Sequence, residues 1–142
     1  MLTRLIFLHD LRFASDATLL FLRLFVGAFL VWGVWDNIIS SERMTEFERF
    51  LDRHGFIWPG IMAPLSVWSQ FACGIAFLLG LLTRWAGLIC AGNFIVAVVM
   101  VDAAGGPRQA FPATMLVLVG LYLATFGAGR FGLDALLTSK LR

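Results

Sequence analysis

The chain has 142 residues, of which 60% are hydrophobic and only 14% are charged, and its mean hydropathy is +0.87. A soluble domain is about 45–50% apolar and about 25% charged, so this composition excludes an ordinary soluble protein and indicates an integral membrane protein. The net charge of +2, without any basic run, excludes nucleic-acid binding. The length fits one transmembrane domain over residues 1–142.

The chain begins with a weakly apolar stretch and continues into a long hydrophobic run. Residues 1–16 contain too short an apolar core for a signal peptide, so we expect either a short helix on the membrane surface or a frayed terminus. Residues 17–39 predict the first transmembrane helix, since about 20 helical residues cross the hydrocarbon core. Arg23 lies about 9 Å into this helix, from where its guanidinium can reach back to the interface.

A polar segment follows, from residue 40 to residue 59, and predicts an amphipathic helix over residues 41–54. Ser41 is the expected N-cap, and Gly55 is the expected stop. One face of this helix is apolar. We expect it to lie on the membrane or over the mouth of the bundle. The apolar face consists of Met44, Phe47, Phe50 and Leu51.

A helical hairpin comes next, and the rest of the chain can be placed relative to it. The runs 61–82 and 86–101 carry no charge and are separated only by Thr83–Arg84–Trp85. This pattern predicts a tight turn at residues 83–85 between transmembrane helices at 61–82 and 85–101.

The C-terminal third predicts a fourth transmembrane helix. Residues 102–109 contain Gly–Gly–Pro and read as a turn, and residues 111–129 form the last uncharged run. Residues 133–141 predict a short surface helix. Short connections make consecutive helices antiparallel, so the predicted fold is all-α, an up-down bundle of four transmembrane helices.

The distribution of Lys and Arg predicts the orientation, because these residues accumulate on the cytoplasmic side. Seven of them lie on the side of the termini and four on the other side, which favours both termini in the cytoplasm. The seven are Arg4, Arg12, Arg23, Arg84, Arg130, Lys140 and Arg142, and the four are Arg43, Arg49, Arg53 and Arg108.

Polar residues on inward helix faces are candidates for a ligand pocket that opens outward, because polar groups in the hydrocarbon region are costly and often functional. Gln70 lies about 13 Å below the outer end of its predicted helix. A purely structural role is the alternative for each of them. Asp36 and Asp102 would then only end their helices in the headgroup layer, and Gln70 would only form a hydrogen bond with a neighbouring helix. The candidates are Asp36, Asn37, Gln70, Asn93 and Asp102.

Four charged residues cluster at the predicted inner interface and are candidates for a structural latch: Arg23, Arg84, Arg130 and Asp134. Asp134 is a candidate ion-pair partner for Arg84. Alternatively, Arg84 and Arg130 only anchor their helices on the cytoplasmic side of the membrane. Cys73 and Cys90 fall inside hydrophobic runs at depths of about 15 and 9 Å, an offset too large for a disulfide. No metal site is predicted from the sequence.

Two stretches resemble the DoxX family of small four-helix membrane proteins. One is the segment 79–84, Leu–Gly–Leu–Leu–Thr–Arg, and the other is the segment 127–137, Gly–Ala–Gly–Arg–Phe–Gly–Leu–Asp–Ala–Leu–Leu. Arg23–Leu24 followed by Gly27 and Gly33 is also similar to the first helix of that family. The family often has a Lys where Asp36 stands and a Glu where Gln70 stands, so the resemblance does not extend to a buried Lys–Glu pair.

The resemblance implies a protein of the bacterial plasma membrane that acts as an accessory or partner subunit in a redox, thiol or quinone-linked complex. It implies membrane lipid and a redox protein as partners, and a quinone or lipid as the bound molecule. The sequence contains no catalytic motif of its own. Two alternatives stay open. One is a binder or transporter of a small molecule or lipid, and the other is an oligomeric scaffold held together by small-residue faces.

Overall fold

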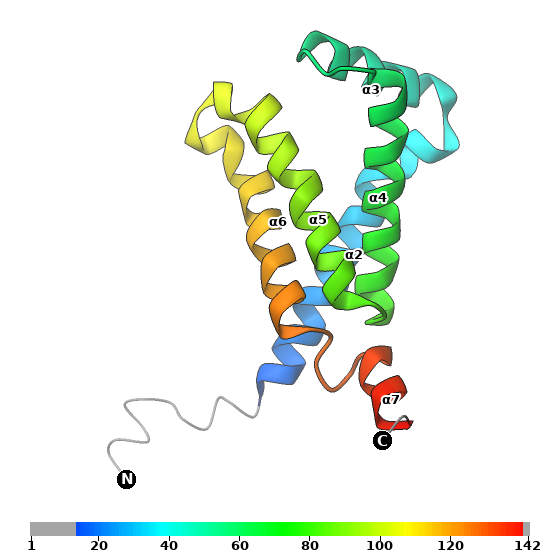
Figure 1. The fold of residues 1–142 in the computed structure, drawn as a ribbon, viewed down its shortest axis with the longest axis vertical. Coiled ribbons are helices and arrows are strands. Elements are labelled where there is room, and N and C mark those ends of the chain that lie inside the picture. The colour runs from blue at the N-terminus through cyan, green and yellow to red at the C-terminus, as the bar shows by residue number, and fades with distance from the viewer. Residues whose placement is uncertain (1–13, 141–142) are drawn as a thin grey trace.

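The computed structural model describes residues 14–140, and within this range the chain is helical (Figure 1). The surface helix predicted for residues 1–16 lies almost entirely outside the described residues. In chain order the elements are α2 (Ser15–Ile39), α3 (Ser41–Arg53), α4 (Pro59–Leu79), α5 (Thr83–Ala97), the π-helical turn η2 (Val98–Asp102), the 3-10 turn η3 (Ala103–Gly105), α6 (Pro107–Phe126) and α7 (Leu133–Lys140).

Four of these helical segments are long and apolar enough to cross a membrane, which confirms the predicted all-α architecture. They are α2, α4, α5 with its continuation through η2 and η3, and α6. The amphipathic α3 and the short α7 lie at opposite ends of the bundle (Figure 1). We refer to these ends as the α3 end and the α7 end.

The bundle consists of two closely packed helix pairs, α2 with α4 and α5 with α6. Each pair contains a glycine-to-glycine contact that brings the backbones together. A Cβ atom placed on Gly27 would lie 2.8 Å from the carbonyl oxygen of Gly74, and one placed on Gly87 would lie 2.5 Å from that of Gly120. Small residues at such crossings let transmembrane helices approach closely, where packing rather than the hydrophobic effect holds them together.

The two pairs are joined mainly through α4 and α5, and they diverge towards the α3 end (Figure 1). The buried core draws on all four transmembrane helices, so it fixes the helices relative to one another. Its fully buried members are Leu19, Val26, Leu30, Cys73, Phe77, Ala86, Cys90 and Leu123.

The hairpin turn lies three residues earlier than the sequence predicts. α4 ends at Leu79, Gly80 adopts a left-handed conformation with φ 65°, and Leu82 is also left-handed with φ 50°. Thr83 then begins α5 instead of forming the turn. The left-handed conformation costs glycine little, so Gly80 ends the helix in spite of the apolar residues that follow.

The N-cap of α3 is also shifted from its predicted place. The Ser40 hydroxyl, not that of Ser41, accepts the hydrogen bond from the backbone N–H of Arg43 at 3.3 Å. Ser41 is already helical, and its carbonyl accepts from the Thr45 hydroxyl. Of the two placements expected for the apolar face of α3, the structure shows the one over the bundle mouth, and Leu51 is buried.

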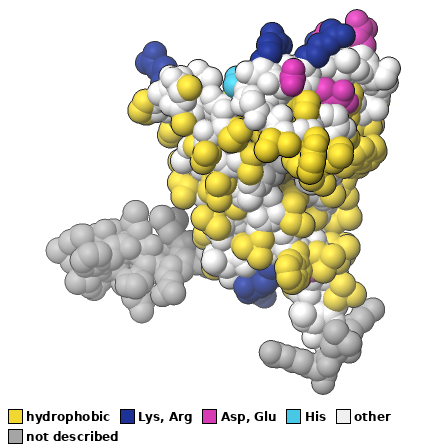
Figure 2. Space-filling model, turned by 45° about the horizontal axis from the view of Figure 1, so that its top comes forward, with side chains coloured by type: hydrophobic (Ala, Val, Ile, Leu, Met, Phe, Trp, Pro, Cys, Tyr) yellow, Lys and Arg dark blue, Asp and Glu magenta, His cyan; other side chains and the backbone are white. Residues whose placement is uncertain are grey.

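The outer surface separates into an apolar belt and a charged cap. Figure 2 shows hydrophobic side chains around the sides of the bundle and charged side chains gathered at the α3 end. Large apolar side chains such as Phe21, Phe25 and Trp32 are more than 70% exposed. In water this exposure would be costly, but the lipid tails of a bilayer cover the belt.

We expect Gly87→Ala to destabilise the bundle by about 1–3 kcal/mol, because the new methyl group would push α5 and α6 apart. Gly92→Ala is the matched control on the same helix, since no atom lies within 4 Å of its Cβ position. Unfolding of both purified variants by SDS titration measures the difference. Equal stability of the two variants would contradict the close contact.

Candidate functional site

A cavity of about 580 Å³ lies between α4 and α5 at the α3 end of the bundle. We call it the main cavity. Apolar side chains of α3 and of the loop after it cover it, and η2 contributes its far edge. Its lining residues are Phe47, Phe50, Leu51, Phe56, Met62, Leu65, Ser66, Ser69, Gln70, Ile89, Gly92, Asn93, Phe94, Val96, Ala97, Val101 and Asp102.

Three of the five predicted pocket residues line this cavity together: Gln70, Asn93 and Asp102. The Gln70 amide donates a hydrogen bond to the Ser66 hydroxyl at 3.1 Å, one turn away on the same helix. Within residues 14–140, the side chains of Asn93 and Asp102 form no hydrogen bond, although both are partly buried. Polar groups in such surroundings gain from a partner, so this arrangement suits a ligand with hydrogen-bonding groups.

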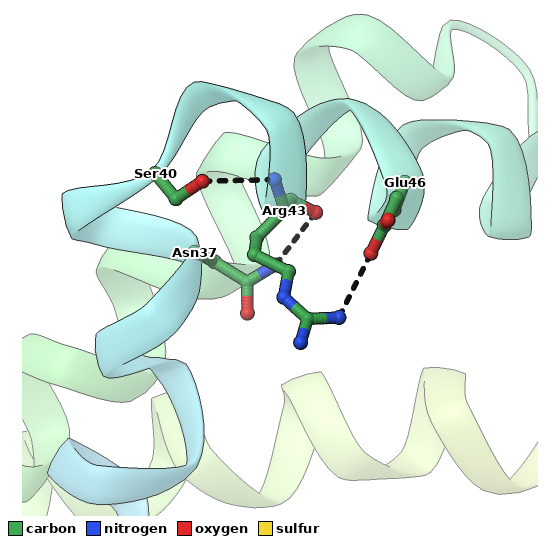
Figure 3. A network of polar contacts seen from close by, with 4 residues as sticks. All are labelled: Asn37, Ser40, Arg43 and Glu46. Carbon is green, nitrogen blue, oxygen red and sulfur yellow. Dashed lines mark hydrogen bonds and ion pairs between the residues drawn. The ribbon is translucent and has the colours of Figure 1, made fainter.

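Asp36 and Asn37 do not line the main cavity. Asp36 is exposed, and the Asn37 amide donates to the carbonyl oxygen of Arg43 at 3.1 Å (Figure 3). The two residues occupy the last turn of α2, where the chain bends into α3. A local contact with α3 therefore uses the polar group of Asn37, which its depth along α2 does not predict.

The corner between α2 and α3 carries a small polar network of its own. Ser40 and Asn37 hold the first turn of α3, and Arg43 forms an ion pair with Glu46 at 3.0 Å (Figure 3). The hydrogen bond with Glu46 raises the pKa of the exposed Arg43 guanidinium. This network fixes how α3 leaves α2 and thereby places α3 over the cavity.

The sequence did not determine which residues cover the main cavity. The apolar face of α3 pointed either to the membrane or to the bundle mouth, and the structure places Phe47 and Phe50 over the mouth. Phe56, in the loop after α3, had no pattern that singled it out. The π-helical turn η2, which sets the position of Asp102, also had no sequence signal.

A second cavity, of about 430 Å³, lies along the same two helices nearer the α7 end. We call it the apolar cavity. It shares Leu65, Ser69 and Ile89 with the main cavity, so the two are neighbours along one surface. Its remaining lining residues are Trp68, Ala72, Cys73, Ala76, Leu82, Trp85 and Ala86.

At the α7 end, Arg23 is 1% exposed and is surrounded by backbone carbonyls. Its Nε donates to the carbonyl of Phe77 at 2.8 Å, and its terminal nitrogens donate to those of Ala128 and Phe131. The side chain of Arg23 therefore extends towards the α7 end. It connects the end of α4 to the loop between α6 and α7, and satisfies carbonyls that lack helical partners.

Asp134 and Arg84 act on helix ends and do not pair with each other. The Asp134 carboxylate accepts from the backbone N–H groups of Leu82 at 2.7 Å and Thr83 at 3.0 Å, so it caps α5 from α7. Arg84 donates to carbonyls at the end of α6, including that of Thr125 at 2.7 Å. The predicted Arg84–Asp134 ion pair is thus wrong, because each charge meets the helix end of opposite partial charge.

The last latch candidate, Arg130, is exposed and lies 3.9 Å from the carboxylate of Asp16 on α2. All four candidates therefore act at the α7 end. Arg23 and Arg84 bind carbonyls, Asp134 caps a helix, and Arg130 forms an ion pair.

Cys73 and Cys90 are both buried and free, and the Cys73 thiol donates to the carbonyl of Ala86 at 3.3 Å. Within residues 14–140, no group of three or more His, Cys, Asp or Glu side chains could hold a metal ion.

Comparison with known proteins agrees with this architecture. The family model of DoxX matches residues 18–103, which include most of α2 and the whole of α3, α4, α5 and η2. The chain belongs to the DoxX family. This DoxX protein is also 27% identical over 130 residues to the inner membrane protein YqjF of Escherichia coli strain K12, an alignment covering 89% of this chain and 96% of that protein. No solved structure matches the chain.

The family match and the relative identify an integral membrane protein of the inner-membrane type. The matched region ends one residue after Asp102, so it contains the main cavity in full. The cavity combines apolar walls with a few convergent polar groups, which is the usual character of a small-molecule site. What this arrangement can do chemically is hold a largely apolar molecule and orient its polar part.

We expect Asp134→Ala to destabilise the protein by about 0.5–2 kcal/mol, the usual effect of removing an N-cap. The charge swap Arg84→Asp with Asp134→Arg should not recover this stability, because the two residues contact different helix ends. SDS titration of the single variants and of the double variant measures both effects. Recovery of the original stability in the swap would show that the two charges pair after all.

Proposed function

We propose that this DoxX-family membrane protein binds an elongated amphipathic molecule, such as a quinone or a lipid, between α4 and α5. The single observation that carries the proposal is the main cavity, where Gln70, Asn93 and Asp102 meet on otherwise apolar walls. Of these, Asn93 and Asp102 have no hydrogen-bond partner within residues 14–140. Three of its lining residues, Leu65, Ile89 and Val96, are also exposed apolar side chains of the belt, which offers such a ligand a route from the bilayer.

A second proposal is that the protein serves as an accessory subunit of a redox or thiol-handling membrane complex, holding its ligand for a partner protein. The structural support is the charged outer face of α3, where Glu46, Arg49, Asp52 and Arg53 line an exposed groove above the cavity cover. Charges of both signs outside the bilayer suit contact with another protein. The family resemblance supplies the redox context of this second proposal.

Gly92→Phe tests the binding proposal, because Gly92 lines the main cavity and has open space around its Cβ position. Gly33→Phe is the matched control, since Gly33 is an exposed transmembrane glycine with equally open surroundings and does not line the cavity. Each protein is purified from native membranes in mild detergent, and the bound small molecules and proteins are measured by mass spectrometry.

We expect the native chain and Gly33→Phe to retain a bound amphiphile and Gly92→Phe to lose most of it. Retention of the same molecule by Gly92→Phe would contradict the assignment of the cavity. Recovery of a redox protein with the native chain would support the accessory role, and its absence from crosslinked native membranes would count against that role.

We also propose that the α7 end faces the cytoplasm and the α3 end faces outward, following the excess of Lys and Arg near the termini. Asp52→Cys on α3 and Ser139→Cys on α7 place exposed thiols at opposite ends. A membrane-impermeant maleimide should label Asp52→Cys on intact cells, and Ser139→Cys only after permeabilisation. The unaltered chain, with buried cysteines, gives the background, and reversed labelling would invert the orientation.

A further inference from the structure

We infer that the ligand of the main cavity is a cationic amphiphile, with an ammonium head group beside Asp102 and a hydrocarbon chain that continues into the apolar cavity. This inference rests on the proposed binding function and names the chemical class of its ligand. It follows from the charge of the cavity, from the aromatic side chains that line the same cavity, and from the continuity of the two cavities.

The charge of the main cavity is negative. Asp102 is the single ionisable side chain among the described residues that line it. The carboxylate has no basic partner within 4.0 Å among residues 14–140, where the ion pairs are Arg43–Glu46 and Arg130–Asp16. A charge in partly apolar surroundings is stabilised by an opposite charge, so the missing partner is a cation.

The helix end that carries Asp102 adds to the negative electrostatic potential of the main cavity. η2 continues α5, and its last carbonyls form the negative end of the helix dipole, which favours cations. The neighbouring arginines of α3 do not reverse the sign. Arg49 and Arg53 lie on the solvent side of α3, in a groove that they share with Glu46 and Asp52, and none of these residues lines the main cavity.

Aromatic side chains cover the same end of the cavity. Phe47, Phe50 and Phe56 come from α3 and the loop after it, and Phe47 and Phe50 lie stacked with ring centroids 6.2 Å apart. The faces of aromatic rings attract ammonium groups, and the attraction is strongest where water is excluded. A cavity lined by one acid and several aromatic rings offers the combination that recognises a substituted ammonium group.

The shape of the combined surface requires a long ligand. From Asp102 to Trp85, the lining residues extend over 17 positions, which correspond to roughly 25 Å of helix rise. The hydrocarbon core of a bilayer is about 30 Å thick. The apolar cavity is lined almost wholly by apolar side chains, and Leu65, Ser69 and Ile89 connect it to the main cavity. A hydrocarbon chain matches this surface, and a compact metabolite does not.

Three probes with the same ten-carbon chain test the inference: decyltrimethylammonium, decanol and decyl sulfate. Each is added below its micellar concentration to the purified chain in a neutral maltoside detergent, and native mass spectrometry measures the bound fraction. We expect the cation to bind about tenfold more tightly than decanol, a difference of about 1.4 kcal/mol, and decyl sulfate to bind most weakly.

Asp102→Asn keeps the shape of the side chain and should remove the preference for the cation. Asp36→Asn, an exposed acid at the same end but outside the cavity, is the matched control and should keep the preference. Gly92→Phe should abolish binding of all three probes.

The outcomes separate this inference from the proposal on which it rests. Equal binding of the three probes, or a cation preference that survives in Asp102→Asn, overturns the cationic head group while the loss of binding in Gly92→Phe upholds the cavity. Binding that Gly92→Phe leaves unchanged overturns both. Circular dichroism and size-exclusion profiles of each variant show that the bundle is intact in every comparison.

Discussion

A backbone donor or acceptor that is buried away from water at a helix end needs a partner from the protein. This constraint explains the α7 end of the bundle. The buried guanidinium of Arg23 occupies the centre of that end and binds carbonyls from two separate segments. Asp134 and Arg84 satisfy the ends of α5 and α6 in the same way. A buried charge is expensive, and here the hydrogen bonds to carbonyls offset that cost.

The α3 end differs from the α7 end because it contains a cavity. There the two glycine-packed helix pairs diverge, and the space between α4 and α5 is covered by an amphipathic helix rather than filled by side chains. The protein thus has one end where charged side chains bond the helix ends and one where Asn93 and Asp102 have no partner among the described residues. The division between a rigid end and a binding end is what connects the fold to the proposed function.

The sequence predicted the number, order and type of the transmembrane helices, because long uncharged runs allow few other structures in a membrane. It also predicted the inward faces of α4 and α5, through Gln70, Cys73 and Asn93, because small and polar residues avoid lipid. It missed the turn position because Asp134, which caps α5, is 52 residues from Leu82 in the chain. The sequence analysis placed Asp36 in the pocket from its depth along α2. That depth does not show that the last turn of α2 bends into α3 outside the main cavity.

The cap that α7 provides for α5 also has a consequence for the order of folding. Asp134 is synthesised after all four transmembrane helices, so the hairpin between α4 and α5 has to wait for the carboxylate that completes its turn. The same holds for Arg23, whose carbonyl partners at Ala128 and Phe131 emerge more than 100 residues later. During translation the helices can enter the membrane one after another, but the α7 end closes only once α7 has been synthesised.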